Sequence, residues 1–538
     1  MYLYRFNILS VLICNTRSMN ALTKLLFISS CVFLFSGNAH SQTRFSKVYY
    51  DLSGAAQASA IVQCPDNGYM VAGQKDDGIL FAKMDSSGGV LWSKKIFSGA
   101  YSNANTALTS TKDACFVLAG TCFDTVTEKG ELLCVKINAN GDTLWTSAIE
   151  AGGSAYANSI EQTADDGFIV AGHTWQSSGA YYDMVVAKLA ANGQPEWVKI
   201  ITGGNNENIA FNAKQLPDGG YVAVGMVVNY PVYTSYACLM KLTPAGEISW
   251  TKKYHLPAAS TSSGYDLDIE PDGILVCLNP DHNNGNVHLM KTDFDGNILW
   301  SKQYSTFFGW NFSNFISSRI SKTSDGGHAI ITAQGAFKTD AAGNVLWSNF
   351  LMFYGINVIE SKDGGYLFLG NGPMIGVKNP GTGLQFGFIK TDSLGNGGDC
   401  IWPEGWSSVN GNIISENMTM TILSNGIRVP ASPEITPTVL SWEDGCVAFI
   451  GKLGESERAE QIKVYPNPTS GIFSFETSGK DKVSSVEVYN LIGDLVFHSN
   501  CPTSNPQTID LHEQPNGIYY LKVKYADRIA SQKVVISH

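Results

Sequence analysis

The sequence predicts an all-β protein, and two observations carry this prediction. Short apolar or alternating runs recur through most of the chain and are separated by glycine, asparagine and aspartate, which is the pattern of strands and tight turns. Between residues 157 and 201, for example, four such runs follow one another as ANSIEQT, GFIVAGHT, DMVVAKLA and PEWVKII. The second observation is that this four-strand pattern repeats along the chain with a nearly constant period.

The first 41 residues have the features of a signal peptide. An apolar run, LLFISSCVFLFSG, follows Lys24, and the small residues Ala39 and Ser41 favour cleavage after Ser41. The apolar run is too short to favour a retained membrane anchor, and no later run approaches the length of a span, so we expect no transmembrane segment after cleavage. Residues 1–41 carry three of the 36 Lys and Arg residues and no acid, so the remainder has 33 basic against 47 acidic residues. This acidic body gives no electrostatic case for nucleic-acid binding.

Seven repeat units are predicted between residues 42 and 398. The lysine in the third predicted strand recurs with steps of 53, 52, 53, 50, 47 and 52 residues, at Lys83, Lys136, Lys188, Lys241, Lys291, Lys338 and Lys390. A second signature precedes each lysine, as in DDGFIVAG from Asp165 and DGGYVAVG from Asp218. Four strands in a period of about 50 residues are typical of β-propeller blades, so the sequence predicts a seven-bladed β-propeller.

A glycine-containing turn and a tryptophan follow each lysine except the last. Stretches such as KTDFDGNILW, which begins at Lys291, therefore predict a tight turn and the start of the outermost strand. The motif resembles the tryptophan-docking motif of quinoprotein-type propellers, which implies docking of the ring against the adjacent blade and implies no cofactor. The predicted structural docking residues are Trp92, Trp145, Trp197, Trp250, Trp300 and Trp347.

The seventh unit has Lys390 and its turn but lacks an outer strand with tryptophan. Residues 45–49, FSKVY, match WSKKI at 92–96 position by position, with Phe45 in place of Trp92. We therefore expect the N-terminal strand to complete the last blade and close the ring, which would remove an unpaired sheet edge.

Residues 399–460 are expected to form an irregular appendage and linker, because they contain Pro430, Pro433 and Pro437 and end in a polar run. From residue 461 to 538 the pattern changes to alternating strands with Asn, Gly and Pro turns. This pattern predicts a small Ig-like β-sandwich.

The last 75 or so residues closely resemble the type A C-terminal sorting domain of the type IX secretion system of Bacteroidota. The resemblance rests on YPNPTSG, VYNLIGDLV, NGIYYLKV and the terminal QKVVISH, in that order. It implies passage from the periplasm through the outer membrane by the type IX machinery, followed by release or attachment to surface lipopolysaccharide. An ordinary adhesion module is the alternative. The predicted sorting-motif residues are Tyr465, Pro466, Asn467, Pro468, Gly471, Asn516 and Gly517.

Ligand binding is expected on one face of the ring. The turns on one side of the predicted blades are short and uniform, whereas the loops on the other side vary in length and are rich in aromatic residues, which suits binding of glycan or protein. Packing of the loops themselves is the alternative role for these rings. The candidate ligand-binding residues are Tyr101, Tyr156, Trp175, Tyr181, Tyr182, Tyr230, Tyr233, Tyr236, Trp310 and Tyr354.

Motifs of known catalytic chemistry do not occur in the sequence, and no cofactor, metal site or catalytic residue is predicted. The scattered cysteines do not have zinc-site spacing, although Cys115 with Cys134, or Cys400 with Cys446, could form a disulfide or remain free thiols. Two functions stay open. The favoured one is a secreted or cell-surface, non-enzymatic binding or adhesion protein. The alternative is a secreted propeller enzyme acting on polysaccharide or peptide, which a cluster of acids near the central channel would favour.

Overall fold

A computed structural model describes residues 44–537 except 51–55, 76–77, 98–105, 125–128, 177–180, 204–205, 231, 233, 256–260, 280–285, 306–317, 334, 352, 373–384, 398–400, 404–406, 411–412, 425–426, 430–434, 439–440, 445–461, 478–482, 491–494, 501–506 and 526–528. The described residues fall into two compact units, 1–448 and 449–538. All of their regular structure is β-strand, which confirms the predicted all-β class. The predicted signal peptide lies outside the described residues.

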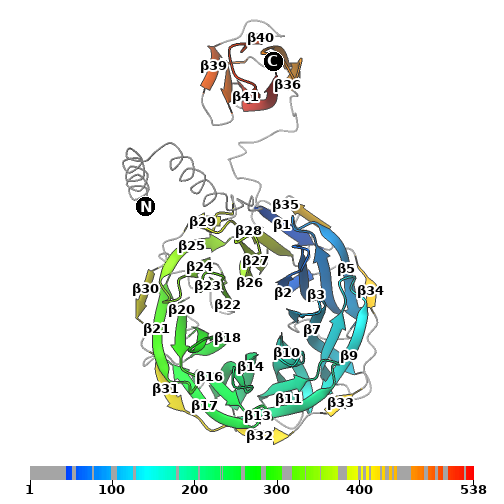
Figure 1. Cartoon of the computed structure of the whole chain (residues 1–538), viewed down its shortest axis with the longest axis vertical. Helices are drawn as coiled ribbons and strands as arrows, with labels where there is room; N and C mark the ends of the chain where they lie inside the picture. Colours follow the sequence, from blue (N-terminus) through cyan, green and yellow to red (C-terminus); the bar gives the residue numbers. More distant parts are fainter. Residues whose placement is uncertain are drawn as a thin grey trace, which may run out of the picture. The chain divides into compact units, whose positions relative to one another are not determined.

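The described part of the first unit contains seven antiparallel sheets of five strands each, arranged as a ring (Figure 1). We number them sheet 1 to sheet 7. The first four strands of sheet 1 are β2 (Ala56–Gln63), β3 (Tyr69–Lys75), β4 (Gly78–Met84) and β5 (Val90–Phe97). Those of sheet 2 are β6 (Ala107–Ser110), β7 (Phe116–Asp124), β8 (Lys129–Ile137) and β9 (Thr143–Glu150). Those of sheet 3 are β10 (Gly153–Gln162), β11 (Phe168–Gln176), β12 (Tyr182–Leu189) and β13 (Pro195–Thr202).

Sheets 4 to 6 repeat this order of four consecutive strands. In sheet 4 they are β14 (Asn206–Gln215), β15 (Tyr221–Asn229), β16 (Thr234–Leu242) and β17 (Ile248–His255). In sheet 5 they are β18 (Ser263–Glu270), β19 (Gly273–Asn279), β20 (Val287–Thr292) and β21 (Ile298–Ser305). In sheet 6 they are β22 (Arg319–Lys322), β23 (His328–Ile331), β24 (Gly335–Thr339) and β25 (Val345–Leu351). The first strand of each sheet lies nearest the centre of the ring (Figure 1).

Sheet 7 combines the two ends of the repeat region. It contains β26 (Tyr354–Glu360), β27 (Tyr366–Asn371), β28 (Phe386–Lys390) and then β1 (Phe45–Tyr50). β1 pairs antiparallel with β28, with Phe45 opposite Lys390, which confirms the expected pairing of the N-terminal strand. The Phe45 ring contacts Tyr69 of sheet 1 edge-on at 6.5 Å between ring centroids.

A belt of seven short strands, residues 401–444, supplies the fifth strand of every sheet. In chain order they are β29 (Ile401–Pro403), β30 (Ser407–Asn410), β31 (Ile414–Asn417), β32 (Thr421–Ser424), β33 (Ile427–Val429), β34 (Ile435–Pro437) and β35 (Ser441–Asp444). They pair with β25, β21, β17, β13, β9, β5 and β1, so the belt passes around the outside of the ring in the reverse order of the sheets (Figure 1).

The expectation of an irregular appendage is therefore wrong for the belt. Each belt strand has only three or four residues, so it is too short to show an alternating pattern. Proline is also compatible with a sheet edge, where its missing N–H costs no ladder hydrogen bond, and Pro437 lies in β34 opposite Lys94. The outer edge of each sheet is thus covered by paired backbone.

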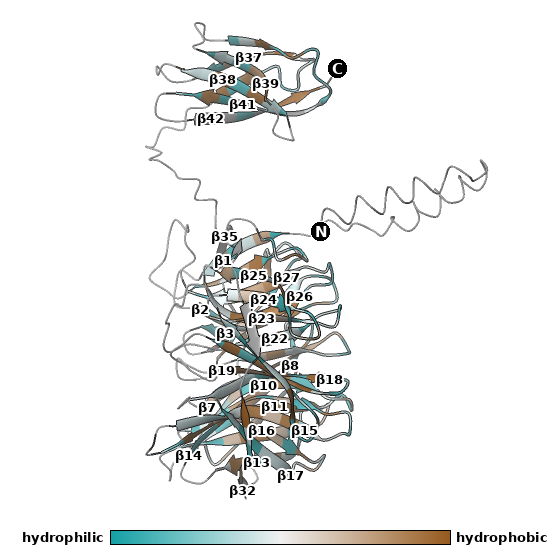
Figure 2. Ribbon diagram, turned by 90° about the vertical axis from the view of Figure 1, so that its left-hand side faces the viewer, coloured by the Kyte–Doolittle hydropathy of each residue, from teal (hydrophilic) through white to brown (hydrophobic). Residues whose placement is uncertain are grey.

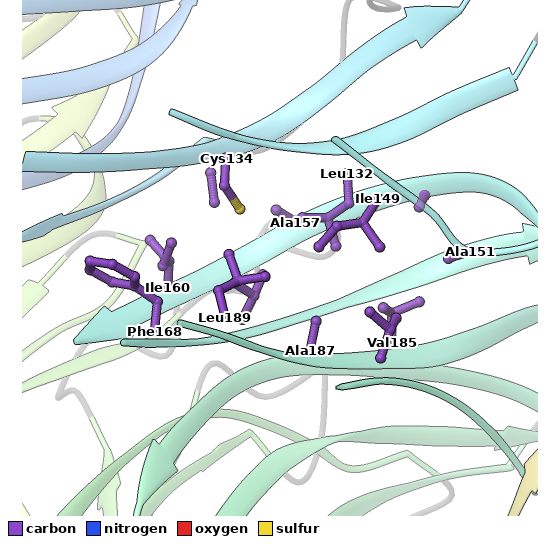
Figure 3. Packing of buried hydrophobic residues seen from close by; sticks show 14 of the residues in the cluster. Leu132, Cys134, Ile149, Ala151, Ala157, Ile160, Phe168, Val185, Ala187 and Leu189 are labelled. Carbon is purple, nitrogen blue, oxygen red and sulfur yellow. The ribbon is translucent and has the colours of Figure 1, made fainter. Parts of the chain in front are cut away.

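Apolar residues from neighbouring sheets pack against each other and form the core of the ring. Between sheets 2 and 3, for example, Leu132 and Ile149 face Ala157, Phe168 and other side chains of the next sheet (Figure 3). The apolar stretches lie mainly within the strands (Figure 2). The belt contributes to this core, because Met420 is buried between sheets 3 and 4 and Met418 packs beside it.

The two sequence signatures of each repeat meet in an ion pair. In all seven sheets the repeated lysine contacts the aspartate of the turn between the first and second strands, with N–O distances of 2.5 to 2.9 Å. The lysine side chains are buried or largely buried, with exposed fractions of 1 to 17%. A Cβ on Gly167 would lie 2.4 Å from Lys188 Nζ and 2.3 Å from the Leu189 carbonyl oxygen, which explains the glycine that follows the aspartate.

The predicted docking tryptophans are half-buried and face the next sheet. Gly193 of sheet 3 has a φ of +80°, and a Cβ there would lie 2.6 Å from the Trp145 ring of sheet 2. Trp145 Nε1 also donates a hydrogen bond to the Ala191 carbonyl of that turn at 3.1 Å. The rings of Trp92, Trp197, Trp250, Trp300 and Trp347 meet the turn glycine of the following sheet in the same way, and Phe45 does so at Gly88.

Cys115 and Cys134 are free thiols, so the disulfide considered for this pair does not form. Cys400 and Cys446 lie outside the described residues.

The described residues of the second unit form two antiparallel sheets around one core. The three-stranded sheet contains β36 (Ile462–Tyr465), β37 (Ile472–Thr477) and β40 (Gln507–Asp510), and the four-stranded sheet contains β38 (Ser485–Asn490), β39 (Leu495–Asn500), β41 (Gly517–Lys524) and β42 (Ile529–Ile536). Phe473 and Ile509 of one sheet share this core with Val488 and Leu521 of the other.

Candidate functional site

Seven of the ten candidate ligand-binding residues can be placed. Tyr101, Tyr233 and Trp310 lie outside the described residues. Five of the others gather at one end of sheets 3 and 4, the end opposite the short glycine turns. They are Tyr156, Trp175, Tyr181, Tyr182 and Tyr230, and together with His173 we call them the aromatic cluster.

Strand pairing in sheet 3 brings four rings of the aromatic cluster together. Tyr156 lies opposite His173, and Trp175 lies opposite Tyr182, in adjacent antiparallel strands. Tyr156 stacks on His173 with centroids 5.1 Å apart, and Tyr182 contacts His173 and Trp175 edge-on at 4.9 Å each. Trp175 is at the outer end of this row and keeps 42% of its surface exposed.

A second contact joins sheets 3 and 4. Tyr181 stacks on Tyr230 with centroids 4.9 Å apart and an interplanar angle of 16°. The Tyr230 hydroxyl donates a hydrogen bond to Glu207 Oε2 at 2.9 Å, which fixes the orientation of this ring. The aromatic cluster therefore combines a row of rings in one sheet with a stacked pair that bridges to the next sheet.

Burial makes the imidazole of the aromatic cluster neutral. It lowers the pKa of His173 to about 4, and Asn158 Nδ2 lies 3.1 Å from His173 Nδ1. Burial, together with the charge of Glu207, raises the pKa of Tyr182. At neutral pH these groups are uncharged, so the cluster offers ring faces, hydroxyls and one imidazole. This chemistry suits stacking on apolar ligand faces together with hydrogen bonds to hydroxyls.

The two remaining candidates do not join the aromatic cluster. Tyr236 of β16 contacts His255 edge-on at 5.3 Å, and Lys253 Nζ lies 4.6 Å from the Tyr236 ring centroid. Tyr354 begins β26 of sheet 7 and is 45% exposed. Both residues nevertheless lie at the end of their sheets opposite the short glycine turns, which is the side of the ring that the sequence predicted for the aromatic residues.

A second group of side chains, which are charged, occurs mainly on the inner strands of sheets 3 to 6. Lys214 Nζ of β14 lies 3.4 Å from Glu161 Oε2 of β10 and 3.3 Å from Asp268 Oδ1 of β18. Glu270 follows Asp268 by two residues in β18. Its carboxylate lies 3.2 Å from Lys322 Nζ of β22 and 3.0 Å from His328 Nε2 of β23. These contacts connect four successive sheets. The strands β10, β14, β18 and β22, one from each of these sheets, lie close to the centre of the ring (Figure 1).

Asp266, two residues before Asp268 in β18, belongs to the same group of side chains, which we call the charged cluster. Asn212 Nδ2 donates a hydrogen bond to Asp266 Oδ1, and the Ile320 amide donates to Oδ2 at 2.9 Å. Burial raises the pKa of Asp266, although the positive charges of Arg319 and Lys214 oppose this shift. The charged cluster contains four carboxylates and three cations: Glu161, Asp266, Asp268, Glu270, Lys214, Arg319 and Lys322.

Neighbouring acids determine the direction of the pKa shift of Lys214, whereas burial determines that of His328. Burial alone would lower the pKa of Lys214, but the charges of Glu161, Asp268 and Asp266 outweigh it and raise the pKa. Burial lowers the pKa of His328, although Glu270 and Asp268 oppose the shift. The side chains of Asp268, Glu270 and His328 are 13%, 11% and 5% exposed.

The members of the charged cluster are far apart in the chain, so no local motif marks them. A signal was nevertheless present, since Glu161, Lys214 and Asp268 each stand four residues before the turn aspartate of their repeat. Alignment of the repeats therefore places these charges at equivalent positions of neighbouring inner strands.

The sorting-motif residues lie at the start and end of the second unit. Asn467 Oδ1 accepts a hydrogen bond from the Val535 amide at 2.8 Å, and Gly517 pairs with Ile536. Gly471 has a φ of +105°, and a Cβ there would lie 2.5 Å from the His512 Cα. The motif at residues 465–471, which begins with Tyr465, is thus hydrogen-bonded to β42, the last strand of the second unit. Asn516 directly precedes β41.

Comparison with known proteins identifies only the second unit. Residues 463–537 match the family described as the secretion system C-terminal sorting domain, which supports the type IX assignment and implies export. No curated protein matches the sequence. Among the described residues, no helix is long and apolar enough to cross a membrane.

Several solved structures have a distant similarity to the chain. A protein of unknown function from Bacteroides caccae is 13% identical, with a TM-score of 0.32 and coverage of 55% of this chain and 93% of that one. A Penicillium chrysogenum α-L-arabinanase complexed with arabinobiose is 11% identical, with a TM-score of 0.39 and coverage of 65% and 98%. Drosophila Plexin A in complex with Semaphorin 1b is 8% identical, with a TM-score of 0.35 and coverage of 65% and 87%. At these scores no activity or ligand carries over to this chain.

Proposed function

We propose that the protein is an exported, non-enzymatic binding protein, whose first unit is a seven-bladed β-propeller that presents the aromatic cluster to a glycan or protein ligand. The observations that carry this proposal are the row of rings in sheet 3, which ends at the partly exposed Trp175, and the stacked pair of Tyr181 and Tyr230, which joins sheets 3 and 4. Adjacent ring faces on a rigid sheet scaffold favour an extended ligand with apolar faces, such as a chain of sugar rings.

In this proposal the sorting domain determines how the protein is exported from the cell. The signal peptide delivers the chain to the periplasm of a member of the Bacteroidota, and the type IX machinery then recognises the Ig-like second unit. The match of residues 463–537 to the sorting family supports this route. The mature protein is then secreted or held at the outer-membrane surface, where a binding surface meets extracellular ligands.

The pairing of β1 with β28 supports a ring closed through its N-terminal strand. A closed and belted ring keeps the strands of sheets 3 and 4 in fixed register, and this register determines the spacing of the rings of the aromatic cluster. Preorganised rings lose little conformational entropy when a ligand binds.

A glycan array probed with the full chain and with Trp175→Ala tests the proposal. We expect the full chain to bind a subset of extended glycans and the variant to lose signal on the same spots. Tyr354→Ala is the matched control, since Tyr354 is similarly exposed but lies outside the aromatic cluster. Equal binding by the full chain and Trp175→Ala, or loss of binding only in the control, would exclude the aromatic cluster as the site.

The second candidate function is a secreted enzyme acting on polysaccharide or peptide. The proximity of Asp268 and Glu270 near the centre of the ring favours it, because paired carboxylates can act as acid and base. However, Lys214 and Lys322 already neutralise these carboxylates, which gives the acids a sufficient structural role. Turnover of an array-positive glycan that Asp268→Asn abolishes would favour the enzyme over the binding protein.

A further inference from the structure

Three potential metal ligands converge between sheets 5 and 6. Asp268 and Glu270 come from β18, and His328 comes from β23 of the neighbouring sheet. One ligand atom of each lies within 4.8 Å of the others. His328 Nε2 is 3.0 Å from Glu270 Oε1 and 3.8 Å from Asp268 Oδ2. Small movements of these side chains would bring the three atoms to the distances of about 2.0 to 2.2 Å that zinc requires.

The carboxylate of Asp268 has one oxygen available for coordination. Its Oδ1 contacts Lys214 Nζ at 3.3 Å. Its Oδ2, which points toward His328, is buried and has no hydrogen-bond partner among the described residues. A buried carboxylate oxygen without a partner is unfavourable, and a cation between Asp268 and His328 would satisfy it.

Binding of a metal ion to these three side chains does not require both nearby lysines to move away. Lys322, which contacts Glu270, has a side chain that is 42% exposed, so it can turn into solvent. Lys214 can stay in place, since it contacts both Glu161 and the other oxygen of Asp268. Of the two lysines, only Lys322 must then move for a metal ion to bind, and the metal also replaces the contact between His328 Nε2 and Glu270 Oε1.

We propose that Asp268, Glu270 and His328 bind one divalent transition-metal ion of the Zn²⁺ class. One imidazole nitrogen and two carboxylate oxygens suit Zn²⁺ and similar first-row metals, whereas Ca²⁺ requires six to eight oxygen ligands. Three protein ligands leave a fourth position for water or a ligand atom. The site is separate from the aromatic cluster and does not depend on the proposed binding function.

Metal analysis after equilibrium dialysis tests this site. The untagged full chain is treated with a chelator, freed of it, and dialysed against a series of Zn²⁺ concentrations. We expect one equivalent of bound zinc, and we expect His328→Asn and Glu270→Gln each to weaken binding by at least about tenfold. Lys322→Gln should bind zinc more tightly than the unaltered chain, because it removes the competing cation.

The matched control is His512→Asn. His512 forms a similar pair with Asp510, with 2.7 Å between Nδ1 and Oδ1, but it lies in the second unit, so its loss should leave zinc binding unchanged. Zinc content no higher than that of the dialysis buffer would overturn the proposal. Unchanged affinity in Glu270→Gln would also overturn it, even if His328→Asn fails to fold, because the glutamine keeps the size of the glutamate.

Discussion

Replacing Met420 with alanine should destabilise the first unit through the belt. Met420 is 8% exposed and packs among buried residues of sheets 3 and 4, where its Sδ lies 3.8 Å from Cys238 Sγ. Burial of a methionine in a core contributes about 2 to 5 kcal/mol relative to alanine. Met420 lies at the periphery of the ring, where neighbours can move into the space, so we expect a loss of about 2 kcal/mol, near the lower end.

Differential scanning calorimetry of the full chain measures this effect separately for each unit. A loss of this size should lower the melting temperature of the larger unit by a few degrees and leave the transition of the second unit unchanged. Ile414→Ala is the control, since Ile414 also belongs to the belt but is 36% exposed and should cost less than about 1 kcal/mol. Equal shifts in the two variants, or none in Met420→Ala, would refute a packed belt.

Two further predictions concern the repeated ion pair and the sorting domain. Partial burial would raise the pKa of Asp165, but hydrogen bonds from Thr163, Lys188 and the Gly167 amide lower it to about 2, below its ordinary value of 3.8. This carboxylate therefore contributes stability above about pH 4, and this stability is lost as the pH falls toward 2. The difference in melting temperature between the unaltered chain and Asp165→Asn should shrink across that interval. A constant difference would contradict a stabilising ion pair between Asp165 and Lys188. A truncation ending at Ala459 should fold but remain in the periplasm of the native host, as measured by cell fractionation, because it lacks the sorting domain; surface display of the truncated protein would disprove the assignment.

Repetition made most of the strands predictable from the sequence. The four predicted runs between 157 and 201 fall on β10 to β13, and the match of residues 45–49 to 92–96 correctly placed β1 beside β28. These predictions succeeded because the same turn and strand residues recur in several repeats. A pattern that occurs by chance in one repeat can therefore be recognised by comparison with the others.

The belt and the charged cluster were not predicted, and the physical reasons differ. Belt strands such as β33 have three residues and exist only because a sheet edge is already present to pair with them, so local sequence carries little information about them. Contacts such as Glu161 with Lys214 depend on the register between separate sheets. The aromatic cluster was partly predictable, because Trp175 and Tyr182 flank one loop, whereas the Tyr181–Tyr230 stack depends on the placement of two sheets.

The roles of exposed and half-buried tryptophans can be separated by measuring binding and melting on the same two variants. Trp175 ends the aromatic cluster, whereas Trp197 packs on Gly246 of the next sheet and donates a hydrogen bond to the Pro244 carbonyl at 3.0 Å. Trp197→Ala should therefore lower stability by roughly 3 kcal/mol. Trp175→Ala should leave the melting temperature almost unchanged and weaken ligand binding by about 1 kcal/mol, or about fivefold.

The most direct test of the binding proposal is the affinity of the full chain and of Trp175→Ala for a glycan that the array identifies, measured by isothermal titration calorimetry alongside thermal melts. The account predicts an affinity about fivefold weaker for Trp175→Ala at an unchanged melting temperature. An unchanged affinity, or a melting temperature that falls as far as that of Trp197→Ala, would show that Trp175 supports the scaffold and that the aromatic cluster is not the binding surface.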